Sequence, residues 1–163
     1  MIMVNTKFYM IVDEALSNEC KRLCDFTDAL DKAPAEKKKQ IADYKCTKYR
    51  YAAVSAVHAA IHNINRCRGL HDMSATHHLL LPFDILLKQH EDYMALYDAA
   101  DEGEKPDYSL YYAMLAFIEE ESSKLESKLP HASDWEAVEL EERIGGLQFA
   151  KVCLDEAWAK REV

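Results

Sequence analysis

Apolar residues recur at intervals of three and four along most of this chain, which is the spacing of one face of an α-helix. The pattern predicts a first helix over residues 5–33, which ends before Pro34 because the residue preceding a proline disfavours helical backbone. A second, long helix is predicted from Pro34, which suits a first helical turn, to Arg68, with Gly69 just beyond its end. The first part of the chain is therefore expected to be helical throughout.

Three more helices are predicted in the rest of the chain. The third runs from residue 74 or 76 to residue 100, and the polar stretch 101–107 (DEGEKPD) predicts a surface loop. A fourth helix follows over residues 108–129. The last helix begins at Ser133, where the S-x-x-E spacing to Glu136 matches a capping box, and continues to about residue 161.

Together these elements predict an all-α fold, a single-domain helical bundle of about five helices over residues 1–163. The second helix is expected to be central, since an apolar stripe (Val54, Val57, Ile61, Ile64) lies opposite a small one (Ala52, Ala56, Ala59, Ala60, Cys67). Gly145 and Gly146 interrupt the last helical pattern, which predicts a kink or a close helix crossing there.

Composition agrees with a folded helical domain. Hydrophobic residues make up 49% of the chain, which argues against disorder, and four Gly and four Pro are too few for a turn-rich β architecture. The net charge is −9, but residues 1–70 carry 12 Lys and Arg against 8 Asp and Glu, whereas residues 71–163 carry 8 against 21. Two interpretations follow: helices of opposite charge that complement one another, or an acidic surface that docks on a basic partner.

The five cysteines favour a reducing, cytoplasmic setting. They are odd in number and none has C-x-x-C spacing. Cys20 and Cys24 have i,i+4 spacing, at which a disulfide would strain the predicted helix. No run of eighteen apolar residues occurs and the N-terminus lacks the features of a signal peptide, so no membrane partner is expected.

Histidines provide the first chemical lead. Six of the seven lie between residues 58 and 90, and His58 and His62 have i,i+4 spacing inside the charge-free stretch Tyr51–Asn65. Their positions predict the flank between the two stripes of the second helix. Such a pair can bind a divalent transition metal if further ligands join it, and the candidates are His71, Asp72, His77, His78 and His90. Because H-E-x-x-H and E-x-x-H are absent, the main hypothesis includes no cofactor and the metal site is an alternative.

A second alternative rests on Arg66 and His71. Their R-x4-H spacing resembles that of the all-helical HEPN ribonucleases and toxins, and the resemblance covers six residues. It implies metal-independent cleavage of RNA by Arg66 and His71 near a dimer interface. The chain departs from that pattern at Cys67, where those enzymes usually have a polar residue, and at Gly69, which predicts a helix end between the two residues.

Direct binding of nucleic acid is disfavoured by the negative charge of the whole chain. The one candidate surface is the basic part of the second helix, where tyrosines are interleaved with lysines and an arginine: Lys37, Lys38, Lys39, Tyr44, Lys45, Lys48, Tyr49, Arg50 and Tyr51. An exposed, solvated end of a long helix explains the same residues.

The last two predicted helices carry the main functional hypothesis. Glutamates gather on both of them, and the candidate partner-binding residues are Glu119, Glu120, Glu121, Glu139 and Glu142. A broad negative face suits a non-catalytic adaptor or inhibitor whose partner is another protein, for example a basic one that binds nucleic acid. The hypothesis also allows a homodimer.

Overall fold

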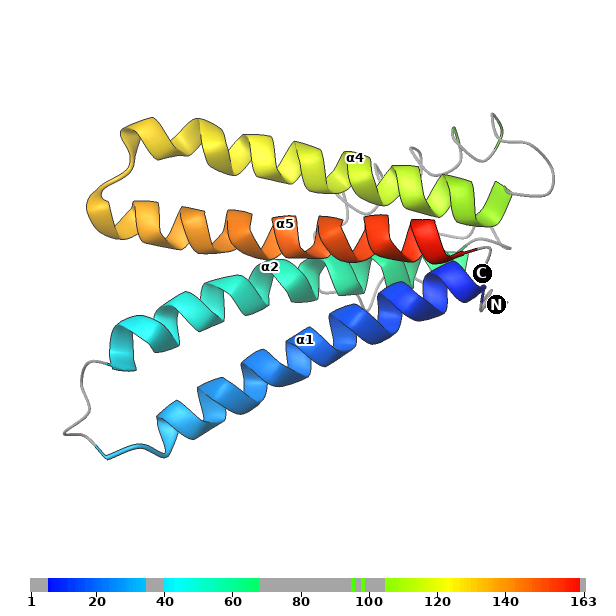
Figure 1. Cartoon of the computed structure of the whole chain (residues 1–163). Coiled ribbons are helices and arrows are strands. Elements are labelled where there is room, and N and C mark those ends of the chain that lie inside the picture. The colour runs from blue at the N-terminus through cyan, green and yellow to red at the C-terminus, as the bar shows by residue number, and fades with distance from the viewer. Residues whose placement is uncertain (1–5, 35–39, 68–94, 96–97, 99–104, 162–163) are drawn as a thin grey trace.

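The computed structural model describes residues 6–34, 40–67, 95, 98 and 105–161. They form the helices α1 (Lys7–Asp31), α2 (Gln40–Cys67), α4 (Lys105–Lys128) and α5 (Asp134–Lys160), with a short 3-10 helix, η2 (Leu129–His131), between the last two. No strand occurs in this part of the chain, so the described residues confirm an all-α helical bundle (Figure 1). None of the helices formed by these residues is long and apolar enough to cross a membrane.

Local capping signals fix two of the helix starts. Thr6 caps α1, and its hydroxyl oxygen accepts a hydrogen bond from the backbone N–H of Tyr9 at 3.2 Å. The predicted capping box of α5 is confirmed: Ser133 Oγ accepts from the Glu136 N–H at 3.3 Å, and the Glu136 carboxylate accepts from the Ser133 N–H at 2.9 Å. These bonds satisfy backbone donors that a first helical turn leaves without partners.

Two predicted boundaries are wrong. The loop expected at residues 101–107 ends early, because α4 already begins at Lys105. Pro106 is tolerated there since a first helical turn makes no use of its missing N–H, and Asp107 lies where the helix dipole favours negative charge. Pro34 lies outside any helix rather than in the first turn of the second one. It follows the end of α1, where the chain reverses direction before α2 (Figure 1).

The described part of the chain contains four α-helices, where the sequence predicts about five. The predicted third helix, over residues 74–100, lies outside the described residues apart from Ala95 and Asp98, which are both helical.

The bundle is organised around α2 and α5, which run in the same direction while α1 and α4 run the opposite way (Figure 1). Each of the two packs against the other and against both α1 and α4. The predicted apolar stripe of α2 is in the core, with Val54, Val57 and Ile61 fully buried. On the small stripe Ala60 is fully buried as well, so α2 packs from more than one side.

Glycine permits a close crossing between α2 and α5. A Cβ atom placed on Gly146 would lie 2.8 Å from the Cβ of Ala53 and 2.9 Å from the carbonyl oxygen of Arg50. Real Cβ atoms do not approach other heavy atoms so closely, and neither neighbour is a flexible side-chain end. The predicted close crossing is therefore confirmed, while α5 continues through it without interruption.

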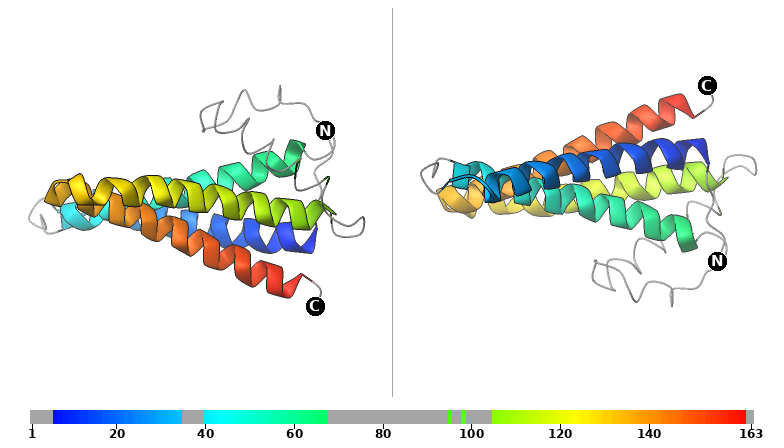
Figure 2. Two further views of the ribbon diagram at one scale, coloured as in Figure 1. Left: turned by 90° about the horizontal axis from the view of Figure 1, so that it is seen from above. Right: turned by 90° about the horizontal axis from the view of Figure 1, so that it is seen from below.

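Beyond this crossing α2 and α5 diverge toward their C-terminal ends (Figure 2). Large aromatic rings pack together near the end of α5. Phe8 of α1 makes edge contacts with Tyr111 and Trp158, at centroid distances of 5.9 and 5.6 Å. Tyr111 and Trp158 stack at 4.6 Å. The Tyr111 hydroxyl donates to Asp155 at 2.6 Å, and burial, followed by this bond, raises the pKa of Tyr111. This cluster joins α1, α4 and α5.

Candidate functional site

The two histidines of the charge-free stretch are bound to side chains of α1. His58 Nε2 lies 2.8 Å from Asp13 Oδ1, and His62 Nδ1 lies 3.0 Å from the Tyr9 hydroxyl. Because α1 and α2 are antiparallel, the i,i+4 pair Tyr9 and Asp13 meets the i,i+4 pair His62 and His58 in reverse order. Both imidazoles therefore have the hydrogen-bond partners that half-buried polar groups require.

The same edge of α2 continues in both directions. Toward the N-terminal end of α2 lies Tyr51, beside Cys24 of α1. Toward the C-terminal end lies Asn65, which is fully buried and whose amide atoms have no hydrogen-bond partner among the described residues. The flank predicted for His58 and His62 is thus the edge of α2 that contacts α1.

A metal site needs ligands beyond this pair. Within the described residues no three His, Cys, Asp or Glu side chains are grouped so that they could hold a metal ion. The further ligands suggested by the sequence (His71, Asp72, His77, His78 and His90) lie outside the described residues. Metal binding by His58 and His62 stays a hypothesis, in which an ion would compete with Asp13 and Tyr9 for the imidazoles.

The candidate catalytic residues are only partly described. Arg66 lies in the last turn of α2, and His71 lies outside the described residues, so the R-x4-H pair stays a prediction. Ser55 lies one turn before His58 on α2, so a catalytic Ser–His–Asp arrangement with Asp13 has to be considered. The Ser55 hydroxyl instead donates to the carbonyl oxygen of Ala52 at 3.2 Å. That bond directs the Ser55 hydroxyl to its own helix.

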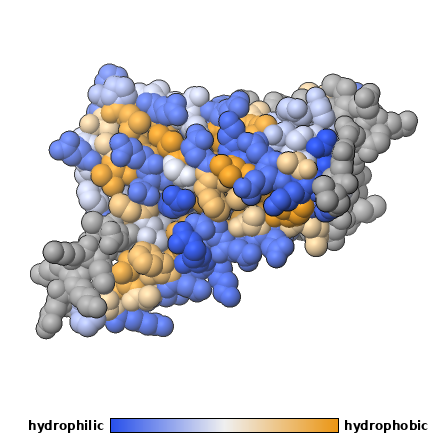
Figure 3. All heavy atoms as spheres, viewed as in Figure 1, coloured by the Kyte–Doolittle hydropathy of each residue, from blue (hydrophilic) through white to orange (hydrophobic). Residues whose placement is uncertain are grey.

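The acidic residues of α4 and α5 are concentrated around the turn that joins these helices. The acidic segment, residues 119–143, contains nine Asp and Glu residues and three Lys and Arg residues. In Figure 1 this segment occupies the end of the bundle where α2 begins and α1 ends. Hydrophilic residues alternate with apolar patches on this face (Figure 3). The turn therefore brings acids from two helices to one end of the molecule.

All five predicted partner-binding glutamates reach the surface. Glu119 is exposed, and Glu120, Glu121, Glu139 and Glu142 are half-buried. Lys124 Nζ lies 3.4 Å from Glu120 and 3.0 Å from Glu121, and Arg143 donates to Glu139 at 3.0 Å. These are pairs within one helix at i,i+3 or i,i+4, which contribute only a few tenths of a kcal/mol, about 0.3–0.5. Such weak pairs can be exchanged for a partner's cations.

Three of these five glutamates line hollows that described residues form on the surface. Glu139 lines a pocket of about 390 Å³ at the α4–α5 turn, Glu121 lines a groove of about 110 Å³ beside Arg143, and Glu142 lines an open pocket of about 300 Å³ with Arg22 and Arg50. The structure therefore assigns Glu142 to the side of α5 that faces α1 and α2. The other two hollows lie on the side of α4.

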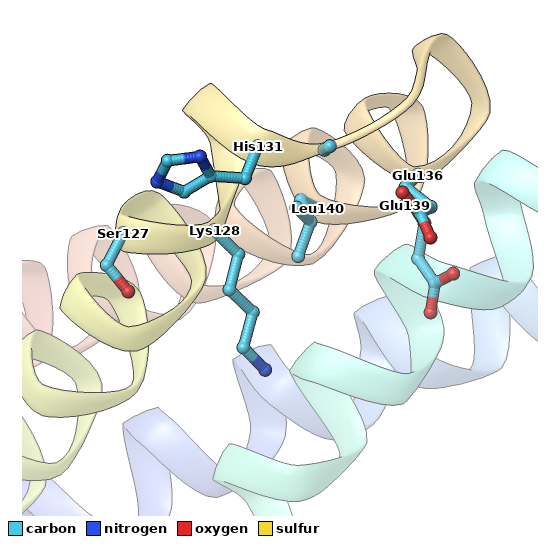
Figure 4. A pocket seen from close by; sticks show the side chains of 7 residues that line it. Ser127, Lys128, His131, Glu136, Glu139 and Leu140 are labelled. Carbon is cyan, nitrogen blue, oxygen red and sulfur yellow. The ribbon is translucent and has the colours of Figure 1, made fainter.

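The pocket at the turn is shown in Figure 4. Leu140 lies at its centre, with Lys128 and His131 on one side and Glu136 and Glu139 on the other. The backbone N–H of Ser133 donates to the Glu136 carboxylate and holds the pKa of Glu136 below its usual value. The pocket thus has an apolar floor between walls of opposite charge, a composition suited to a polar or charged side chain of another protein.

Contacts between α2 and α5 were not apparent from the sequence. Lys45 Nζ lies 4.7 Å from the centre of the Trp135 ring, and the Arg143 guanidinium lies 5.6 Å from the ring of Tyr49. Basic and aromatic side chains of the two helices therefore complement each other. Tyr49 contacts α5 and Tyr51 contacts α1, so both tyrosines contribute to packing between helices of the bundle. Lys37, Lys38 and Lys39 lie outside the described residues.

No model of a protein family, no curated protein and no solved structure matches this chain. Its function is therefore inferred from its own residues.

Proposed function

We propose that this protein acts without catalysis, by binding another protein through the acidic segment, residues 119–143. The observation that supports the proposal is the composition of this segment, which has nine acidic and only three basic residues where α4 and α5 meet at their turn. The acidic side chains of this segment are exposed or half-buried, so they are available to a partner. A surface of one sign attracts partners of the opposite sign and speeds their association.

Trp135 adds an apolar anchor to this charged surface. It is the second residue of α5 and 45% of its surface is exposed. Tryptophan is among the residue types that contribute most to protein interfaces. The contact with Lys45 at 4.7 Å demonstrates that a cation fits over this ring, so a lysine or arginine of a partner could take the same place.

The chemistry of the acidic segment defines the class of partner. A protein with a basic surface, such as one that binds nucleic acid, has the charge that the segment requires. A homodimer formed through this same surface would bring like charges together, so self-association would have to use another face. The reduced thiols of Cys20, Cys24 and Cys153 suit the reducing cytoplasm proposed as its location.

Charge reversal tests the proposal. We expect the replacement of Glu119, Glu120 and Glu121 by Lys to reduce recovery of a partner at least tenfold. Recovery is measured by affinity purification from the cells that produce the protein. The reason is that three attractive charges become repulsive ones while the core is untouched. Quantitative mass spectrometry of the recovered proteins measures the effect.

A matched control uses the acidic residues of α1. Asp25, Asp28 and Asp31 are exposed, and replacing all three by Lys changes the net charge by the same amount. Recovery should then remain within about twofold of the unmodified protein. Equal recovery with both triple variants, or equal loss with both, would refute a specific role for the acidic segment.

A further inference from the structure

Two thiols and a phenol meet on the edge where α1 contacts α2. Cys20 is half-buried and packs against the core, and Cys24 is exposed one turn further along α1. Tyr51 of α2 packs against the same core and lies beside Cys24. All three residues lie outside the acidic segment, so the proposed partner binding does not involve them.

The spacing of the two cysteines suits a bridging metal ion better than a disulfide. Cβ atoms at i and i+4 of a helix are about 5–6 Å apart. A disulfide requires about 3.5–4.5 Å between Cβ atoms, which would distort α1. Two metal–sulfur bonds of about 2.3 Å in a line separate the sulfurs by about 4.6 Å, which both side chains can reach from an undistorted helix.

We propose that Cys20 and Cys24 form a two-coordinate site for the soft cation Cu(I). Thiolates are the ligands that Cu(I) prefers, whereas a structural zinc ion takes four ligands and no third His, Cys, Asp or Glu joins the pair in the described residues. Binding replaces the two thiol protons with one Cu(I), releases both protons to solvent and leaves the oxidation state of the metal unchanged. Tyr51 of the neighbouring helix lies beside Cys24.

The test is anaerobic titration of the reduced full-length protein into the Cu(I) complex of bathocuproine disulfonate, whose colour is lost when the protein removes the metal. We expect one Cu(I) per chain, and none in the variant with Cys20→Ser and Cys24→Ser. Circular dichroism establishes that the variant is folded.

The other cysteines provide the controls. Cys46→Ser, Cys67→Ser and Cys153→Ser should each retain one Cu(I) with the affinity of the unmodified chain. The proposal is overturned if the unmodified chain removes no Cu(I), if the Cys20/Cys24 variant still removes one Cu(I), or if any control abolishes binding. None of these results bears on the acidic segment, which contains no cysteine.

Discussion

Replacing Gly146 with Ala should lower the free energy of unfolding by up to about 2 kcal/mol, which is the cost of overpacking a core, about 1–3 kcal/mol, less the helix propensity that Ala gains over Gly. The added Cβ would lie 2.8 Å from Ala53 Cβ and 2.9 Å from the Arg50 carbonyl oxygen, so α2 and α5 must move apart. This cost outweighs the gain of about 1 kcal/mol that Ala has over Gly inside a helix. Urea unfolding followed by circular dichroism measures the difference.

The adjacent glycine is the matched control. A Cβ on Gly145 meets only Arg50 Nη1, at 3.6 Å, which is an ordinary contact with the end of a flexible side chain. Gly145→Ala should therefore stabilise the protein by about 1 kcal/mol through helix propensity alone. Opposite signs at neighbouring positions are the expected result. A stabilising Gly146→Ala would contradict the close crossing.

Replacing Phe8 with Ala should have the largest effect, a loss of about 3–5 kcal/mol. Phe8 is completely buried and its ring contacts both Tyr111 and Trp158, so its removal leaves a cavity where α2 and α5 diverge. Loss of this size is a large share of the stability of an ordinary domain, about 5–15 kcal/mol. Chemical unfolding and the near-ultraviolet signal of Trp158 would report it.

Phe26 provides the control on the same helix. Its side chain is 44% exposed, so Phe26→Ala should cost about 1 kcal/mol or less. If Phe8→Ala and Phe26→Ala destabilised the protein equally, Phe8 would not occupy the centre of the aromatic cluster.

Much of this fold could be predicted from local patterns. Helical spacing predicted α1, α2 and α5, and the Ser133–Glu136 capping box fixed the start of α5, because both signals act within a few residues. The start of α4 was missed because Pro106 and its acidic neighbours are as typical of a loop as of a first helical turn. The glycine pair predicted a close crossing without identifying Ala53 as its partner, since that contact depends on how distant helices pack.

The functional residues were harder to predict for the same reason. The i,i+4 spacing of His58 and His62 identified one edge of α2, but Asp13 and Tyr9 are about fifty residues away in sequence. A matching i,i+4 pair of polar residues on α1 was the available signal. Likewise, the contact between Lys45 and the Trp135 ring could not be predicted from charge alone, because no spacing in the sequence relates residues of two distant helices.

Both interpretations of the charge split stay predictions. Among the described residues, Arg50 lies 3.8 Å from the buried Glu19 of α1, which belongs to the same basic half of the chain, and Lys45 of that half contacts the ring of Trp135 rather than a carboxylate. The Arg22 hydrogen bond holds the pKa of Glu19 below its usual value despite burial. Glu119 and Glu141 of the acidic segment are exposed, and we propose that such residues meet the partner.

Zero-length crosslinking tests the central claim most directly. A carbodiimide joins a carboxylate to a lysine only where the two groups touch, so it reports which acids of this protein meet a basic partner in their complex. The proposal predicts crosslinks from carboxylates of the acidic segment, residues 119–143, to lysines of the partner. Crosslinks from Asp25, Asp28 and Asp31 of α1 instead, with none from the acidic segment, would contradict it.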